Sequence, residues 1–488
     1  MNSMKYFSLI LFALTTSAVL GQGRSEKRGL SYGEYSALDL EALAPGVSWI
    51  YNWHHQPKTS VLNSHETYDM DFIPMAWNGA FNKEAMRTFI ANHPKVKYIL
   101  GFNEPNFKDQ ANMTPTEAAA KWPEIEAIAD EYNLEIVGPA VNYCGNCVSE
   151  NGTTYNDPFK YLDDFFAACP DCRVDHIAIH CYMNDVNALK WYVGEFKKYD
   201  RPIWLTEFAA WEGTVTLEQQ KNFMFNAINY LESDPDVFRY AWFTGRFENK
   251  SPFIGILSQS SASLTALGEI YVNTPVHDPT VYSNIPGILQ TENYSDMSGV
   301  KLELTNDQTG VINVSDISAN DWTEYKIDVP EDNNYQTYAR IAGINAGSIE
   351  IMEGSNVLAT ITFTSTGSYQ TWDEFPAIVP LTAGEHTLRL KYKSAGFKLN
   401  WLDFKDPNIL SEETDVLGDL KIYPNPSSSS IQIEAGSRWH ELEIMDVVGK
   451  KFYHGQIQRS FEGLSSGTYL FKFVSQDGRT VVKKIIRR

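Results

Sequence analysis

The sequence is short of positive charge. Its 40 Lys and Arg stand against 61 Asp and Glu, and the 488 residues carry a formal net charge of −21. The phosphates of a nucleic acid would repel such a protein, so we expect no nucleic-acid partner. The composition suits a soluble secreted protein that acts on a neutral polymer.

Several catalytic motifs are also missing. The chain has no phosphate-binding loop and no dinucleotide fingerprint. His176 and His180 have the spacing of a metal-binding helix, but they fall in a strand-like run. There they would lie roughly 13 Å apart, too far to bind one metal ion. We expect no cofactor for catalysis.

Long apolar runs are confined to the N-terminus. Residues 6–20 form an apolar stretch after Lys5 and end near the small residue Gly21, which predicts a secretory signal peptide over residues 1–22. The run is too short for a permanent anchor, and no cysteine follows it to accept a lipid. No later run is long enough to span a membrane. We therefore expect the mature protein to leave the cytoplasm.

Cysteine is scarce, and its five copies lie between residues 144 and 181. Cys144 and Cys147 form one Cys-x-x-Cys pair, and Cys169 and Cys172 form another. Two such pairs have the spacing of a four-thiolate zinc site. In a secreted protein we expect two disulfides instead, with the connectivity open. Cys181 is expected to be a buried free thiol.

What the sequence does contain, between residues 28 and 275, is a regular alternation of strand and helix patterns. Segments of helical periodicity separate most of the short apolar runs, and eight such units in roughly 250 residues predict a (β/α)8 TIM barrel. The strand-like runs are residues 29–33, 47–53, 71–77, 97–103, 135–142, 174–182, 201–208 and 239–244.

Two glutamates occupy matching positions in this pattern. Glu104 follows the fourth run and Glu207 lies near the end of the seventh. The C-terminal ends of barrel strands share one rim, where active sites form. Each carboxylate could simply cap a strand and pair with a neighbour. Two carboxylates at one rim are, however, the minimal apparatus for cleaving a glycosidic bond.

Aromatic and amide residues surround the two glutamates at the expected rim. Such groups suit a glycan, which offers apolar C–H faces and many hydroxyls, although any one tryptophan could equally belong to the core. The candidate substrate-binding residues are Trp53, Trp77, Asn103, Asn142, His180, Tyr182 and Trp242.

These motifs resemble glycoside hydrolase family 128. The resemblance is carried by RGLSY at 28–32, WIYNW at 49–53, FIPMAWN at 72–78, GFNEPN at 101–106 and WLTEF at 204–208. It implies a retaining endo-β-1,3-glucanase that hydrolyses glucans such as laminarin or curdlan. It makes Glu104 the acid/base and Glu207 the nucleophile, and it places Asn103 near the sugar 2-hydroxyl. His180 and Tyr182 match the strand-six position that contacts the nucleophile in such barrels.

After residue 275 the pattern changes to short alternating strands, which predict a β-sandwich over residues 280–405. This region is similar to carbohydrate-binding module family 6, a jelly-roll, through LQTENY at 289–294, DWTEY at 321–325 and GFKLNW at 396–401. The resemblance implies a sugar site with Trp372 and Asn400, although Asp316 stands where a second aromatic is usual. It also implies a structural calcium at Glu292, with Asp403 as a candidate partner. A surface ion pair of Glu292 is the alternative.

The last segment differs in charge. An acidic linker at 406–416 precedes residues 417–488, and from Asp419 onward 11 Lys and Arg outnumber 7 Asp and Glu. IYPNP at 422–426, ELEIMDVVGK at 441–450 and LSSGTY at 464–469 resemble the type IX secretion sorting domain of Bacteroidota. The resemblance implies a small β-sandwich, a partner in the type IX machinery, and a secreted or cell-surface protein.

Two other functions remain open on the sequence. One is a barrel hydrolase of the same clan acting on another β-glycan, such as mixed-linkage glucan or a β-1,3-linked galactan. The other is a surface glycan-binding protein whose barrel has lost catalysis.

Overall fold

The computed structural model describes residues 24–260, 262–406, 420–423, 427, 430–436, 439–446, 450–465, 467–475 and 480–487. The chain divides into two compact units, Met1–Phe404 and Lys405–Arg488. The expected signal peptide and residues 407–416 of the expected linker lie outside the described residues. Among the helices that are described, none has the length and apolarity to cross a membrane.

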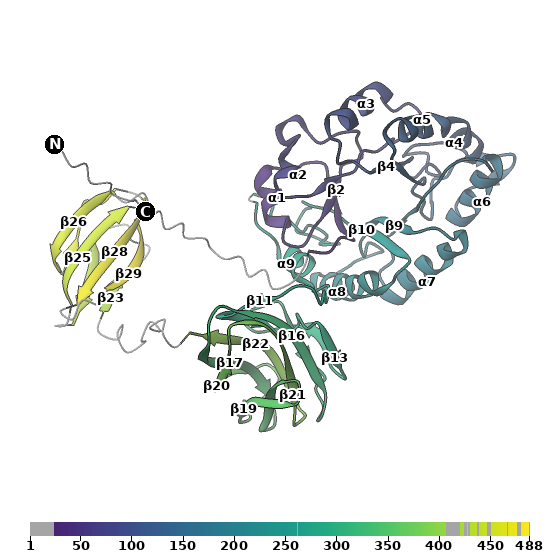
Figure 1. The fold of residues 1–488 in the computed structure, drawn as a ribbon. Coiled ribbons are helices and arrows are strands. Elements are labelled where there is room, and N and C mark those ends of the chain that lie inside the picture. The colour runs from purple at the N-terminus through teal and green to yellow at the C-terminus, as the bar shows by residue number, and fades with distance from the viewer. Residues whose placement is uncertain are drawn as a thin grey trace, which may run out of the picture. The chain divides into compact units, whose positions relative to one another are not determined.

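The N-terminal region, here called the α/β domain, is built around eight parallel strands (Figure 1). Six form one sheet in the order β3-β2-β1-β10-β9-β8, and β4 pairs with β5. A parallel bridge joins Met75, just after β3, to Leu100 of β4, and another joins Val137 of β5 to His176, just before β8. Strand pairing therefore continues from the last strand back to the first. The strands are β1 (Arg28–Ser31), β2 (Trp49–Tyr51), β3 (Asp71–Phe72), β4 (Tyr98–Leu100), β5 (Glu135–Val137), β8 (Ile177–Cys181), β9 (Ile203–Phe208) and β10 (Val237–Phe243). Each overlaps one of the eight strand-like runs of the sequence.

Helices lie outside these strands in Figure 1. Their starts follow from local chemistry: Ser36, Thr114 and Thr216 form capping boxes that satisfy the first free backbone N–H groups. The helices are α1 (Ala37–Leu43), α2 (Ser64–Thr67), α3 (Lys83–Asn92), α4 (Pro115–Lys121), α5 (Pro123–Tyr132), α6 (Pro158–Ala168), α7 (Val186–Phe196), α8 (Leu217–Ser233) and α9 (Ala266–Asn273). Short 3-10 turns, η1 (Thr59–Val61) and η2 (Lys197–Tyr199), and a hairpin of β6 (Ser149–Glu150) and β7 (Thr153–Thr154) complete the domain.

The strands bury both of their faces, because side chains alternate along each strand. One face contributes to a small cluster that includes Trp49, Trp204 and Ala241. The other face packs in the large cluster that contains helix residues such as Ile125 and Leu231. This alternation fixes which residue at a strand end faces the site.

Residues 283–405, here called the β-rich domain, form two six-stranded sheets. One has the order β11-β16-β21-β18-β19 with β13 on β16, and the other β14-β15-β22-β17-β20 with β12 on β22. Residues of both sheets share one apolar core. The strands are β11 (Ser283–Asn284), β12 (Gly287–Gln290), β13 (Asp296–Ser298), β14 (Lys301–Leu304), β15 (Ile312–Ser315), β16 (Trp322–Val329), β17 (Asn333–Gly343), β18 (Gly347–Glu353), β19 (Asn356–Phe363), β20 (Trp372–Leu381), β21 (Gly384–Tyr392) and β22 (Phe397–Lys405). The multidomain layout with a later β-rich region is confirmed, and the jelly-roll connection stays a prediction.

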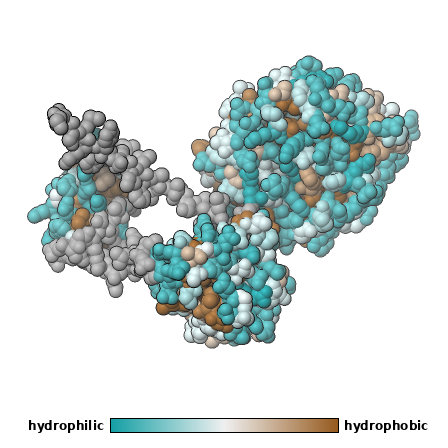
Figure 2. All heavy atoms as spheres, viewed as in Figure 1, coloured by the Kyte–Doolittle hydropathy of each residue, from teal (hydrophilic) through white to brown (hydrophobic). Residues whose placement is uncertain are grey.

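The C-terminal unit also consists of strands. The sheet β23-β24-β27 and the sheet β26-β25-β28-β29 share a core that includes Trp439, Phe471 and Phe473. The strands are β23 (Leu420–Tyr423), β24 (Ile431–Ala435), β25 (Trp439–Asp446), β26 (Lys451–Gln456), β27 (Ser460–Phe461), β28 (Gly467–Ser475) and β29 (Thr480–Arg487). Figure 2 shows hydrophilic residues over most of the visible face of the α/β domain, in keeping with the acidic composition.

Candidate active site

Glu104 lies in the turn that follows β4 and is 8% exposed. Its backbone N–H donates to the carbonyl of Ala140 at 2.9 Å. Its φ of 41° lies in the left-handed region, which non-glycine residues rarely adopt. Such local strain concentrates at functional sites, where the surrounding structure holds a side chain in one position.

Glu207 lies on β9 and is 5% exposed. Three side chains donate hydrogen bonds to its carboxylate. The indole N–H of Trp53 donates to Oε1 at 2.7 Å, the hydroxyl of Tyr51 donates to Oε1 at 3.2 Å, and the hydroxyl of Tyr182 donates to Oε2. These donors favour the charged carboxylate and fix its orientation.

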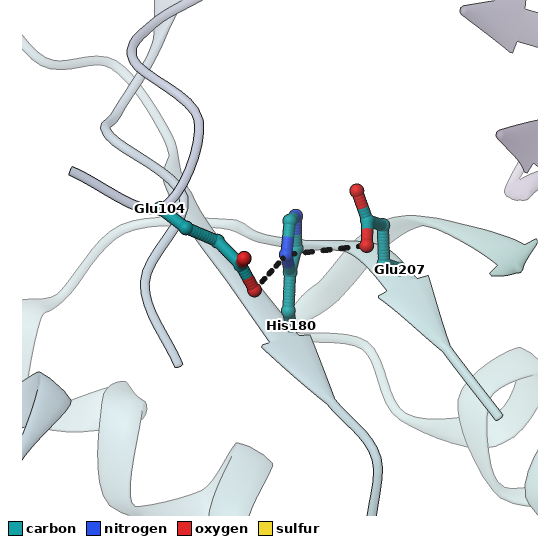
Figure 3. Close-up of side chains that lie close together, drawn as sticks. All are labelled: Glu104, His180 and Glu207. Atoms are coloured by element: carbon teal, nitrogen blue, oxygen red, sulfur yellow. Dashed lines mark hydrogen bonds and ion pairs between the residues drawn. The ribbon is translucent and has the colours of Figure 1, made fainter. Parts of the chain in front are cut away.

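His180, on β8, lies between the two glutamates and has no exposed surface (Figure 3). Its Nδ1 atom is 2.9 Å from Glu104 Oε1 and 3.5 Å from Glu207 Oε2. One carboxylate oxygen of each glutamate and a ring nitrogen of His180 all lie within 4.8 Å of one another. Strands β4, β8 and β9 thus bring two carboxylates and one imidazole to a single point.

Burial and mutual charge set the protonation of this cluster. Burial and the Glu104 charge raise the pKa of Glu207, against the lowering effects of His180 and of the Tyr182 and Trp53 hydrogen bonds. Burial alone would lower the pKa of His180, but the two carboxylates raise it overall. Burial raises the pKa of Tyr182 well above its usual range, and the Glu207 charge adds to this. The phenol therefore stays protonated and acts as a donor.

Two carboxylates and an imidazole could in principle hold a divalent metal ion. A metal-binding imidazole must be neutral and must direct a lone pair at the ion. The raised pKa of His180 favours the imidazolium form, and its Nδ1 faces Glu104. Glu207 already accepts three hydrogen bonds. The cluster suits acid–base and nucleophilic chemistry better than metal binding.

The structure places several of the predicted substrate-binding residues beside the glutamates. Trp53 and Tyr182 contact Glu207 directly. Asn103 precedes Glu104 and is buried, with its Nδ2 atom 3.2 Å from Gln110. Its Oδ1 atom has no hydrogen-bond partner within the described residues. This amide oxygen can therefore accept a hydrogen bond from a ligand.

Two further predicted residues have weaker connections to the site. Trp77 is partly buried against the inner cluster, and its carbonyl accepts the N–H of Asn103 at 3.0 Å. Asn142 uses its side-chain oxygen to accept the N–H of Tyr143 at 2.8 Å. For Trp77 and Asn142, contact with the substrate therefore remains a prediction.

The expectation for Trp242 is wrong. This residue has no exposed surface, and its indole N–H donates to the carbonyl of Ile254 at 2.8 Å. It packs in the large outer core, edge-on to Phe208 at 5.0 Å. Because side chains alternate along β10, the next residue, Phe243, reaches the site instead. Its ring lies 5.9 Å from Trp53 and 5.8 Å from Tyr182.

Sequence reasoning missed Tyr51 and Phe243 as site residues. Tyr51 lies in an apolar run, a pattern that predicts a core residue. In the structure it has no exposed surface. Only its hydroxyl contact with Glu207 gives it a role at the site. Phe243 could have been found from strict alternation along residues 240–243, where Trp242 and Phe243 must face opposite sides.

The cysteines are paired within their own motifs, Cys144 with Cys147 and Cys169 with Cys172. Cys181 is a buried free thiol, and burial raises its pKa to about 12. His176 lies away from the glutamates and is bonded through Nε2 to Glu135 at 2.6 Å. It is not part of the three-residue cluster.

In the β-rich domain, the sugar contact of Asn400 stays a prediction, and its Oδ1 atom has no hydrogen-bond partner within the described residues. Asn400 has no exposed surface, and its Nδ2 atom donates to Asp307 at 2.9 Å and to the carbonyl of Thr309 at 2.7 Å. Trp372 is partly exposed. Asp316 is exposed and pairs with Lys301 at 2.6 Å instead of offering an aromatic face.

Glu292 is 5% exposed, and burial raises its pKa to about 8. Its Oε2 atom has no hydrogen-bond partner within the described residues. A buried carboxylate with a free oxygen fits a calcium ligand, because calcium would supply the missing charge partner. Asp403 lies on β22, opposite Ile288 of β12.

Comparison with known proteins extends over all three regions. A glycosyl hydrolase catalytic core model matches residues 29–271, a carbohydrate binding module (family 6) model matches residues 290–406, and a secretion system C-terminal sorting domain model matches residues 421–488. A curated relative, alkali-sensitive linkage protein 1 of Schizosaccharomyces pombe, is 29% identical over 51% of this chain. The chain spans 45% of that protein's length.

Two solved structures of glycoside hydrolase family 128 are similar to the α/β domain. A subgroup II endo-β-1,3-glucanase from Sorangium cellulosum is 42% identical over 52% of this chain and all of that chain, with a TM-score of 0.46. A subgroup II endo-β-1,3-glucanase from Pseudomonas viridiflava is 37% identical over 52% of this chain and 99% of that chain, with a TM-score of 0.48. On this sequence identity, the chain belongs to glycoside hydrolase family 128, and it carries a family 6 carbohydrate-binding module and a secretion sorting domain.

Proposed function

We propose that this protein is a secreted, retaining endo-β-1,3-glucanase whose α/β domain is a (β/α)8 TIM barrel. One observation carries the proposal: Glu104, after β4, and Glu207, on β9, are both buried, and one carboxylate oxygen of each lies within 4.8 Å of the other. Retaining glycosidases hold their two carboxyl groups about 5–5.5 Å apart, whereas inverting enzymes need about 6.5–9.5 Å to admit a water. A distance of at most 4.8 Å between the nearer oxygens agrees better with the retaining arrangement.

The hydrogen bonds support a division of roles. Glu207 accepts three hydrogen bonds that favour and orient the charged carboxylate, the form that attacks the anomeric carbon, and they oppose the burial and the Glu104 charge that raise its pKa. Glu104 then protonates the leaving glycosidic oxygen, and the glycosyl group becomes an ester of Glu207. In the second step Glu104 takes a proton from a water molecule whose oxygen attacks the anomeric carbon. The bond from that carbon to Glu207 breaks, which frees the carboxylate and releases the sugar with its configuration retained.

His180 lowers the electrostatic cost of burying two carboxylates close together. Two carboxylates this close repel each other, and a positive imidazolium between them offsets that repulsion. Its Nδ1–H group can donate to Glu104, the nearer of the two. His180 is thus a positioning residue for both glutamates.

The proposed substrate is a β-1,3-glucan such as laminarin or curdlan. Trp53, Tyr182 and Phe243 offer aromatic surfaces beside Glu207, which suit the apolar faces of glucosyl units. The free Oδ1 atom of Asn103 can accept the sugar 2-hydroxyl. The two solved relatives are endo-β-1,3-glucanases, which supports the linkage.

The other regions serve this activity in the proposal. The β-rich domain tethers the enzyme to polysaccharide, with calcium at Glu292 as a structural ion. The C-terminal domain directs the protein through type IX secretion to the cell surface or the medium. The two Cys-x-x-Cys disulfides stabilise the α/β domain in that oxidising setting.

Activity on a substrate panel tests the proposal. The wild type should release oligosaccharides from laminarin and curdlan, and little from cellulose or mixed-linkage glucan. Glu104→Gln and Glu207→Gln should each lower kcat by about a hundredfold to ten-thousandfold. Glu135→Gln, which changes a glutamate at the start of β5, is the matched control and should keep full activity. Equal activity of all variants would exclude the two-carboxylate mechanism, and a wild type active only on another glycan would exclude the linkage.

A further inference from the structure

The turn that carries Glu104 is bound by a neighbouring segment to which the hydrolytic steps give no role. Asn106, two residues after Glu104, has no exposed surface. Its Nδ2 atom donates to the carbonyl of Asn142 at 2.8 Å and to the carbonyl of Tyr155 at 3.3 Å. Both acceptors belong to the segment 142–156, which follows β5 and contains the β6–β7 hairpin. One buried amide therefore joins the Glu104 turn to both ends of that segment.

The Cys144–Cys147 disulfide closes the part of this segment that touches the turn. The carbonyl of Asn106 accepts the N–H of Val148 at 2.9 Å, and Cys144 Sγ lies 3.5 Å from the same oxygen. Phe107 forms an antiparallel bridge with Cys147. Because a disulfide removes conformational freedom from the loop that it closes, this one fixes the backbone that Asn106 and Phe107 contact.

Glu104 needs such support because of its own backbone conformation. Its φ of 41° is unfavourable for a residue with a side chain, and such conformations persist only where surrounding contacts fix them. The N–H of Glu104 donates to the carbonyl of Ala140, and the N–H of Phe107 donates to the carbonyl of Glu104, each at 2.9 Å. The turn is thus bound on one side to the chain after β5 and on the other to the residue that bridges to Cys147.

We propose that Asn106 and the Cys144–Cys147 disulfide form a clamp that positions the carboxyl group of Glu104 for proton transfer. The inference rests on the proposed function, in which Glu104 is the acid/base, and adds positioning residues to it. Proton transfer requires hydrogen-bond reach, and a misplacement of about 1 Å can lower a rate about a hundredfold. Glu207 has three hydrogen-bond donors of its own, so loss of the clamp should weaken proton donation and leave the nucleophile in place.

The test compares two substrates that differ in their need for an acid. The sugar hydroxyl that leaves from laminarin must be protonated, whereas the phenolate of a 2,4-dinitrophenyl β-laminaritrioside leaves without a proton. Asn106→Leu keeps the approximate shape of the side chain and removes its donor. It should lower kcat/KM on laminarin about ten- to hundredfold and change kcat/KM on the aryl substrate by less than about threefold. Glu104→Gln should show the same selectivity with a larger loss on laminarin.

The two disulfides provide a matched pair of variants. Cys144→Ser/Cys147→Ser should lower kcat/KM on laminarin at least about threefold relative to the aryl substrate. Cys169→Ser/Cys172→Ser is the control, because this disulfide follows α6 and Cys169 Sγ lies 4.0 Å from the carbonyl of Ala119 on α4. It should leave the ratio of the two kcat/KM values unchanged.

The outcomes separate the clamp from the proposed function. A wild type that hydrolyses neither substrate overturns the proposed function and the clamp with it, as does an equal loss on both substrates in Glu104→Gln. An unchanged ratio in Asn106→Leu and in Cys144→Ser/Cys147→Ser overturns the clamp alone. An equal loss on both substrates in these two variants also overturns it, because their residues would then only support the fold. A selective loss in Cys169→Ser/Cys172→Ser would show a general effect of disulfide removal and would overturn the clamp as well.

Discussion

Replacing His180 by asparagine should shift the pH dependence of hydrolysis. The asparagine amide can place a neutral nitrogen near the position of Nδ1, so the change removes the charge and keeps a donor. In the wild type, burial and the Glu104 charge raise the pKa of Glu207, whereas His180 lowers it. Without the imidazolium, Glu207 holds its proton to higher pH. The proposed nucleophile then becomes available only at higher pH.

The size of the shift follows from the geometry. His180 Nδ1 lies 3.5 Å from Glu207 Oε2, and both residues are almost fully buried. An opposite charge at such a distance changes the pKa of a carboxyl group by about one to three units. The acid limb of kcat/KM on soluble laminarin should therefore move up by about one to three pH units. His176→Asn is the control, since His176 pairs with Glu135 outside the cluster and should leave the profile in place.

The same substitution should have a pH-dependent effect on stability. The pKa of His180 is raised in the folded protein, so its stabilising contribution is fully present below the unfolded value of about 6.5. It is lost as the pH rises through the higher folded value. The difference in Tm between wild type and His180→Asn should thus be larger at pH 5.5 than at pH 9. An unchanged acid limb together with a Tm difference that does not depend on pH would refute the charge argument.

Three further outcomes are expected. All four cysteines of the Cys-x-x-Cys pairs should be oxidised in the secreted protein, each bonded within its own motif. Mass spectrometry of non-reduced peptides would show this pairing, and stoichiometric zinc would contradict it. Calcium should raise the Tm of the β-rich domain. Glu292→Gln should abolish that rise, because the substitution removes the charge of the buried carboxylate. An equal rise in both proteins would place the ion elsewhere. A chain ending near Asp278 should keep its rate on soluble laminarin. It should lose activity mainly on insoluble curdlan, where tethering raises the local concentration of the enzyme. An equal loss on both substrates would show that the later domains support catalysis itself.

The strands and the two glutamates could be predicted because local patterns specify them. Short apolar runs identified all eight parallel strands, and the charged residues at the ends of two of them marked Glu104 and Glu207. Their meeting at His180 follows from parallel pairing, which brings the C-terminal ends of β4, β8 and β9 to one side. Local sequence and parallel topology therefore suffice for the centre of the site.

The misplaced residues depend on contacts that local patterns do not contain. Trp242 lies at a strand end, yet alternation along β10 turns it into the outer core and brings Phe243 to the site. Asn400 matches a family sugar contact, and the sequence does not show that its amide nitrogen donates to Asp307 and to the carbonyl of Thr309.

The anomeric configuration of the first product tests the central claim most directly. Time-resolved proton NMR of laminarin hydrolysis by the full chain shows which anomer appears before mutarotation. With Glu104 and Glu207 oxygens within 4.8 Å, the proposed mechanism passes through a glycosyl ester of Glu207, and the β anomer should appear first. Initial release of the α anomer would mean inversion and would contradict the account.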